Sequence, residues 1–351
     1  MPHEDKMTTK NIRIIVSGSD EDIALSTMIG VGVSGIVHLS PCGTKVIKSV
    51  PAWRGDERDV ATRCKQLRNE IALYQYLPQN HPRLPRYIES VDDGEKTVAL
   101  TLEYLPNATL HEYLRGYTLQ QFFKMRTPKD KTQAEFEASL RRRHDSIPLR
   151  ERARWCLEAA DGIVMLHSHG VIHADLKPEN MGVDANLGVR LLDLAGSARL
   201  GVSPALCLES TRYFMSRASW DIVNETTDCF ALGSSIYHIV TGWRPYDSLP
   251  DDEVEARYER QEFPDLSGQS TEGPVMEKTD EVMSETLSQT PDTTGISPVT
   301  GQLLFANTIR GCWFAEFASA ADVLESLKKE VLSTFDEADL AYIRKASGIS
   351  L

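Results

Sequence analysis

The sequence predicts an α+β fold: a smaller, mostly antiparallel β part with one main helix, followed by a larger, mostly α-helical part. Three observations support this. β-branched residues flank a glycine-rich turn at residues 29–39, and more β-rich segments follow. Apolar residues recur at helical spacing over residues 56–77, where Pro78 ends the pattern. Residues 148–167 carry a wide apolar stripe, which is typical of a core helix.

The expected elements follow in order along the chain of 351 residues, which is long enough for two lobes or two domains. In the β part they are residues 11–16, 29–39, 45–50, 56–77 (the helix), 87–89 and 98–102. In the helical part they are residues 108–123, 148–167, 228–240 and 319–332, with a helical stop at Thr241-Gly242.

Two segments interrupt the helical part. Residues 125–147 are charged with little apolar periodicity, which predicts either an insertion or a partly solvated helix extension. Residues 266–301 are rich in Ser, Thr, Gly, Pro, Glu and Asp, which predicts a disordered acidic insertion. The expected organisation is therefore an N-terminal extension, two lobes and a C-terminal tail, at residues 1–24, 25–105, 106–333 and 334–351.

Composition excludes several classes of protein. The chain has 38 Lys and Arg against 51 Asp and Glu, a net charge of −13, which argues against nucleic acid or an anionic membrane as main partner. No apolar run is long enough to span a bilayer, and the N-terminus lacks the pattern of a signal peptide. The six cysteines are scattered and form no Cys-x-x-Cys pair, which argues against a zinc or disulfide framework. We expect a cytoplasmic protein, with the nucleus left open.

The candidate catalytic residues lie in one short span. Asp175 can accept a hydroxyl proton, and the Lys177 ammonium can neutralise a phosphate. Asn180 and Asp193 offer the oxygen ligands that magnesium prefers. This set of residues suits phosphoryl transfer.

The glycine-rich turn holds Gly30, Gly32 and Gly35 in the pattern G-x-G-x-x-G-x-V. A dinucleotide-binding turn would need a helix to open after the third glycine, whereas residues 36–41 are typical of a strand and turn. A plain hairpin is the other alternative. Without side chains, the backbone amides of such a loop can also close over phosphates.

Together these motifs resemble those of the eukaryotic protein kinase superfamily. His-Ala-Asp-Leu-Lys-Pro-Glu-Asn at 173–180 and Asp-Leu-Ala-Gly at 193–196 resemble its catalytic loop and metal-binding motif. The other motifs fall in kinase order over roughly residues 25–333. The particular residues in these motifs resemble those of small kinase-like proteins of filamentous fungi. The resemblance implies a bilobal protein-kinase-like fold and an enzyme of the serine/threonine type.

The resemblance also assigns roles in the first lobe. Lys48, anchored by Glu70, would bind the α- and β-phosphates of ATP. Backbone groups near Glu103 and Leu105 would hydrogen-bond adenine. The rest of the nucleotide site would consist of Gly30, Gly32, Gly35, Val37 and Val46.

In the second lobe the resemblance makes Asp175 and Lys177 catalytic, and Asn180 and Asp193 magnesium ligands. Asp228 resembles the aspartate that holds the catalytic-loop backbone. The implied cofactors are ATP and Mg²⁺, and the implied partner is a protein with a serine or threonine acceptor. Neither nucleic acid nor a membrane is implied, and nothing indicates an oligomeric state.

Several residues depart from the family pattern. Ala174 replaces an arginine that receives an activation-segment phosphate, so we expect that phosphorylation there is not the main switch. Met215-Ser216-Arg217 stands where Ala-Pro-Glu is usual, and both members of the family's buried ion pair are expected to be missing. Ala195 replaces a glycine, and Gly182 replaces the leucine that commonly lies under adenine.

These departures keep two alternatives to an active protein kinase. One is a catalytically weak pseudokinase that serves as a nucleotide-binding or scaffold module. The other is a small-molecule kinase, against which Lys177 and the full activation segment argue.

Overall fold

The computed structural model describes residues 27–50, 57–94, 98–116, 133–206, 209–219, 222–267, 295–297 and 301–351. It divides into two compact units, which we call the β unit (described residues up to Asn80, and Arg86–Tyr104) and the helical unit (His81–Pro85, and described residues from Leu105 onward). The expected extension at 1–24, with its strand at 11–16, lies outside the described residues.

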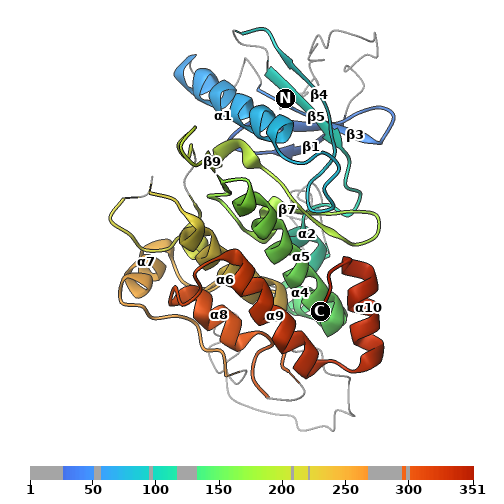
Figure 1. The fold of residues 1–351 in the computed structure, drawn as a ribbon, viewed down its shortest axis with the longest axis vertical. Coiled ribbons are helices and arrows are strands. Elements are labelled where there is room, and N and C mark those ends of the chain that lie inside the picture. Colours follow the sequence, from blue (N-terminus) through green and yellow to red (C-terminus); the bar gives the residue numbers. More distant parts are fainter. Residues whose placement is uncertain are drawn as a thin grey trace, which may run out of the picture. The chain divides into compact units, whose positions relative to one another are not determined.

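The β unit contains one five-stranded antiparallel sheet in the order β1-β2-β3-β5-β4, drawn in Figure 1. Its elements are β1 (Thr27–Val31), β2 (Ile36–Leu39), β3 (Lys45–Ser49), α1 (Glu57–Tyr76), β4 (Tyr87–Asp92) and β5 (Val98–Glu103). Helix α1 packs on β4 and β5. Its buried apolar side chains recur every three or four residues, at Val60, Cys64, Leu67, Ile71 and Tyr74, and this stripe is the reason the helix docks on the sheet.

The helical unit is built around α5 (Leu149–Ser168), which packs against α6 (Glu225–Thr241), α9 (Ala320–Thr334) and α10 (Glu337–Ser347), as Figure 1 shows. The part of this unit that the structure describes also contains α2 (Leu110–Arg115), α4 (Gln133–Asp145), α7 (Asp251–Glu259) and α8 (Ala306–Trp313). Short strands pair as β6 (Val171–Ile172) with β9 (Ala198–Arg199), and as β7 (Met181–Val183) with β8 (Val189–Leu191). The described residues also form the 3₁₀ turns η2 (Pro178–Asn180), η3 (Leu194–Gly196) and η4 (Thr211–Tyr213).

Of the two segments predicted to interrupt the helical part, the structure describes much of the first and only a few residues of the second. Of the first, residues 133–145 form α4, and Leu140, His144 and Ile147 are buried, so this portion is a packed helix. Of the second, residues 268–294 and 298–300 lie outside the described residues, whereas Ile296 forms a β-bridge with Leu303.

The expected stop of α6 is present. The helix ends at Thr241, and Gly242 takes the left-handed conformation at φ 79° that closes it. A Cβ atom at residue 242 would lie 2.7 Å from the His144 ring of α4, so a side chain is excluded there by both conformation and space.

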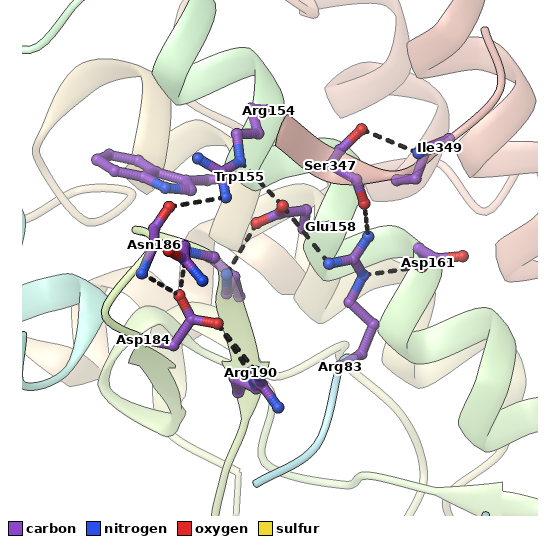
Figure 2. Close-up of polar contacts among 12 residues, drawn as sticks. Arg83, Arg154, Trp155, Glu158, Asp161, Asp184, Asn186, Arg190, Ser347 and Ile349 are labelled. Atoms are coloured by element: carbon purple, nitrogen blue, oxygen red, sulfur yellow. Dashed lines mark hydrogen bonds and ion pairs between the residues drawn. The ribbon is translucent and has the colours of Figure 1, made fainter. Parts of the chain in front are cut away.

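A buried network of charged groups joins α5, the β7–β8 hairpin and the C-terminal end of α10 (Figure 2). Glu158 of α5 accepts a hydrogen bond from the Val189 amide at 2.8 Å and pairs with Arg154 and Arg83 at 3.0 and 3.4 Å. Arg83 also donates to the Ser347 carbonyl oxygen. The network therefore ties β8, the strand that leads to Asp193, to the central helix α5.

None of the helices in the part of the chain that the structure describes combines the length and the apolar character that a membrane span requires.

Candidate active site

In the β unit, Lys48 and Glu70 form a buried ion pair. The Lys48 Nζ atom lies 2.7 Å from Glu70 Oε2, and the side chains are 12% and 2% exposed. Lys48 lies on the central strand β3, and Glu70 lies on the buried stripe of α1. The sheet and the helix thus hold the ammonium group in one place, as the resemblance implied.

The glycine-rich turn connects β1 to β2. The Gly32 amide donates to the Gly35 carbonyl oxygen at 2.8 Å, and a Cβ on Gly35 would lie 2.7 Å from the Ser49 carbonyl oxygen. Gly35 is therefore required for the close approach of this turn to β3. A strand follows the turn, so the dinucleotide-binding alternative is wrong.

The remaining predicted nucleotide residues of the β unit lie on the same sheet. Val37 pairs with Lys48 across β2 and β3, and Val46 pairs with Leu102 across β3 and β5. Glu103 ends β5, where its amide donates to the Arg86 carbonyl oxygen at 3.0 Å.

In the helical unit, Asp228 holds the backbone of the catalytic loop. Its carboxylate is fully buried and accepts hydrogen bonds from the His173 amide at 2.8 Å and the Ala174 amide at 3.0 Å. The His167 Nε2 atom lies 2.9 Å from the same carboxylate. Ala174 has φ 62°, an uncommon conformation for a residue with a side chain, and these hydrogen bonds stabilise it.

The loop gathers four polar side chains. The Lys177 ammonium lies 2.8 Å from both carboxylate oxygens of Asp175 and 2.8 Å from the Ser210 hydroxyl. The Asn180 amide nitrogen donates to Asp175 Oδ2 at 2.9 Å. Burial raises the pKa of the Asp175 carboxyl, while the nearby Lys177 charge opposes that rise. A hydroxyl placed beside Asp175 and Lys177 would therefore meet a proton acceptor and a cation together.

Asp193 lies next to this cluster. It follows β8 with φ 58°, and the amide of Leu192 donates to the Asn180 carbonyl oxygen at 2.8 Å. The charge of Asp193 also contributes to the raised pKa of Asp175. Asn180 Nδ2 is bound to Asp175, so its side-chain oxygen is the group that could bind a metal. An amide oxygen and the carboxylate oxygens of Asp193 are hard ligands of the kind that magnesium prefers.

The sequence reasoning missed an ion pair in the activation segment. Arg217 stands where the family has glutamate, and it pairs with the buried carboxylate of Glu209 and stacks over the Phe214 ring at 4.3 Å. Burial raises the pKa of Glu209 to about 7 despite this arginine. This pair lies within the segment itself and differs from the family's pair, whose glutamate position is occupied here by Arg217. The opposite charges of Glu209 and Arg217, eight residues apart, were the signal in the sequence that could have indicated this pair.

Gly182 is buried against the side chains of Leu105 and Leu192, and a Cβ at residue 182 would collide with Leu105. The side chain of Leu105 thus occupies the space that a larger residue 182 would need. Beside the catalytic loop lies a pocket of about 570 Å³, whose lining includes Lys177, Ser210 and Tyr213.

Comparison with known proteins finds a family match and several similar sequences. The sequence model of a family described as "Protein kinase domain" matches residues 24–293. The chain is 25% identical to serine/threonine-protein kinase shk2 of Schizosaccharomyces pombe, 24% to Aurora kinase A-A of Xenopus laevis and 26% to serine/threonine-protein kinase PknB of Mycobacterium leprae. These matches cover 66%, 69% and 61% of this chain, but only 35%, 53% and 31% of the relatives.

Proposed function

This chain belongs to the protein kinase family, and we propose that it transfers the γ-phosphoryl group of Mg-ATP to a serine or threonine hydroxyl of a protein substrate. The observation that carries the proposal is the cluster of Asp175, Lys177 and Asn180, joined by hydrogen bonds of 2.8–2.9 Å. It combines a buried proton acceptor with a cation in one loop held by Asp228.

Asp175 orients the acceptor hydroxyl and takes its proton. Its raised pKa brings the carboxylate nearer to the basicity that proton transfer at neutral pH needs. Lys177 neutralises the phosphoryl group as it transfers. In this reaction class, positioning and charge stabilisation supply most of the rate, and three anchored backbone and side-chain contacts keep both groups in place.

Asn180 and Asp193 hold the magnesium ion, which when bound screens the negative charge of the phosphates. The Asn180 side chain is oriented by its hydrogen bond to Asp175, and Asp193 is positioned by β8. Lys48, kept in place by Glu70, binds the α- and β-phosphates. The loop of Gly30, Gly32 and Gly35 covers them.

Two observations favour a serine or threonine acceptor. Lys177 stands two residues after Asp175 and contacts both that carboxylate and Ser210, an arrangement that resembles serine/threonine kinases. Two of the relatives are named as serine/threonine-protein kinases, although each is matched over about a third of its length.

The alternative of a catalytically weak pseudokinase draws on one feature of the structure. The activation segment carries its own Glu209–Arg217 pair, and Ala174 provides no guanidinium beside it. An activation segment with its own ion pair could serve as a binding surface for another protein, as in a scaffold module, instead of docking a substrate.

A phosphoryl-transfer assay separates the two functions. Full-length protein receives radiolabelled Mg-ATP and equimolar peptides that differ only in a serine, threonine or tyrosine acceptor. We expect label on the serine and threonine peptides, and Asp175→Asn should lower the rate by about 10²–10⁴-fold. Asp252→Asn makes the same charge change at an exposed site on α7 and should keep the full rate.

Binding is measured separately by thermal unfolding with and without Mg-ATP. An active kinase and a nucleotide-binding module should both be stabilised by the nucleotide. Stabilisation without transfer to any peptide would favour the pseudokinase, and labelling of the tyrosine peptide alone would refute the proposed specificity. Absence of both effects would refute nucleotide-dependent function altogether.

A further inference from the structure

Two histidines and a glutamate from three different segments meet in the helical unit. They are His111 of α2, Glu179 of η2 and His238 of α6. The His111 Nδ1 atom lies 3.4 Å from His238 Nε2 and 3.3 Å from Glu179 Oε1. All three ligand atoms lie within 4.8 Å of one another. We propose that this trio binds a single zinc(II) ion, through His111 Nδ1, His238 Nε2 and Glu179 Oε1.

The distances suit tetrahedral zinc. Zinc binds histidine nitrogen and carboxylate oxygen at about 2.0–2.2 Å, so two ligands of one tetrahedron lie about 3.3–3.6 Å apart. The two short separations, 3.4 and 3.3 Å, match or closely approach that edge before any metal is present. Two imidazoles with one carboxylate form a donor set that zinc accepts, whereas magnesium and calcium prefer oxygen ligands alone.

The surroundings of the trio also fit a metal site. The Tyr213 hydroxyl oxygen lies 2.7 Å from His238 Nδ1, so it can accept the proton of that nitrogen and leave Nε2 as the donor to a metal. The second carboxylate oxygen of Glu179, Oε2, is buried and has no hydrogen-bond partner among the described residues. A divalent cation bound at Oε1 would compensate the charge of this carboxylate.

Protonation of the histidines does not compete at neutral pH. Burial and the charges of Arg115 and Arg244 lower the pKa of His111 to about 3, and burial lowers the pKa of His238 well below its usual value. A lowered pKa favours the neutral ring, which is the form of histidine that binds metal. The two arginines are paired with Asp247, which reduces their repulsion of a cation.

An entry path exists. Glu179 lines the pocket of about 570 Å³ beside the catalytic loop, so the ion can reach the trio from solvent and a water can fill its fourth position. Because Glu179 and Asn180 share one 3₁₀ turn, zinc would tie the turn that carries Asn180 to α2 and α6. The proposal does not depend on the proposed phosphoryl transfer.

Zinc binding is measured by competition with a chromophoric chelator on metal-free, full-length protein. Cys42 is exposed, its pKa is lowered to about 7, and Cys207 lies outside the described residues, so both are replaced by serine in every variant to remove competing thiols. We expect one equivalent of zinc, and an affinity at least about a hundredfold weaker in His111→Asn and in Glu179→Gln. His169→Asn removes an imidazole outside the trio and should leave zinc affinity unchanged.

A second readout requires no change in the trio. Cobalt(II), which replaces zinc, should show the intense visible absorption of a four-coordinate ion in the parent protein and in His169→Asn. This absorption should be lost in Glu179→Gln. Thermal unfolding without metal checks that each variant is folded. Zinc affinity equal in all variants, no stoichiometric binding, or the pale spectrum of six-coordinate cobalt would each overturn the proposal.

Discussion

Asp228→Asn tests whether the buried carboxylate holds the catalytic loop. Asp228 accepts hydrogen bonds from the amides of His173 and Ala174 and from His167. An asparagine has one acceptor oxygen, so its best orientation keeps His173 and His167 bound and turns its NH₂ group toward the Ala174 amide. One buried donor then loses its acceptor, at about 1–3 kcal/mol.

The two surviving hydrogen bonds also weaken, because the acceptor is no longer charged, at about 1 kcal/mol each. The total loss is therefore about 3–5 kcal/mol. Since 1.4 kcal/mol corresponds to a factor of ten, the amides of His173 and Ala174 should exchange hydrogen at least about a hundredfold faster. Hydrogen exchange reports on this loop directly, so it does not require the two units to unfold together.

Asp339→Asn is the matched control. Asp339 pairs with Arg150 at 2.8 Å in a partly exposed setting, so its loss should leave exchange in the catalytic loop unchanged. A less than tenfold acceleration in Asp228→Asn, or an equal effect in the control, would refute the assignment of loop stability to this carboxylate.

Two further predictions concern pH and packing. Glu209 has a pKa of about 7 in the folded protein against 4.5 ordinarily. In this range the folded state keeps a proton on Glu209 that the unfolded state has lost. The contribution of Glu209 to the free energy of unfolding should therefore fall by on the order of 2–3 kcal/mol as pH rises from about 4.5 to about 7. Urea unfolding should show that the free energy of unfolding declines across this pH range, and that the decline is smaller in Glu209→Gln. Parallel pH curves for the parent protein and the variant would contradict this prediction. Gly182→Ala should cost less than about 1 kcal/mol because the Leu105 side chain can rotate away, whereas Gly233→Ala should cost about 1–3 kcal/mol because its Cβ meets that of Cys312. Denaturation midpoints compare the two, and equal losses would refute this distinction.

Local patterns in the sequence predicted much of the fold. The apolar spacing of residues 56–77 corresponds to α1, and the stripe of residues 148–167 corresponds to α5. The stop at Gly242 was also predicted, because a helix end depends on a few neighbouring residues. The charged segment before α5 was ambiguous, since within residues 138–145 of α4 only Leu140 and the polar His144 are buried, which leaves a weak apolar signal.

The candidate site was predicted through the order of its motifs. Lys48 and Glu70 are 22 residues apart, and nothing in either local sequence requires them to meet; the resemblance named the pair and the structure places the atoms 2.7 Å apart. The role of Ser210 beside Lys177 had no local signal, because its contact spans 33 residues.

The chain's residues alone predicted the longest helices, most strands of the β part and the reacting groups of the catalytic loop, because periodicity, caps and short motifs act between near neighbours. Only the tertiary structure decided that Arg217 finds Glu209 and that His111 meets His238, which is 127 residues away. The contact of His111 with His238 depends on how α2 and α6 pack, and the contact of Glu209 with Arg217 depends on the course of the segment that carries both. No spacing in the sequence encodes these contacts, whereas burial in the folded chain raises the pKa of Glu209 and lowers the pKa values of His111 and His238.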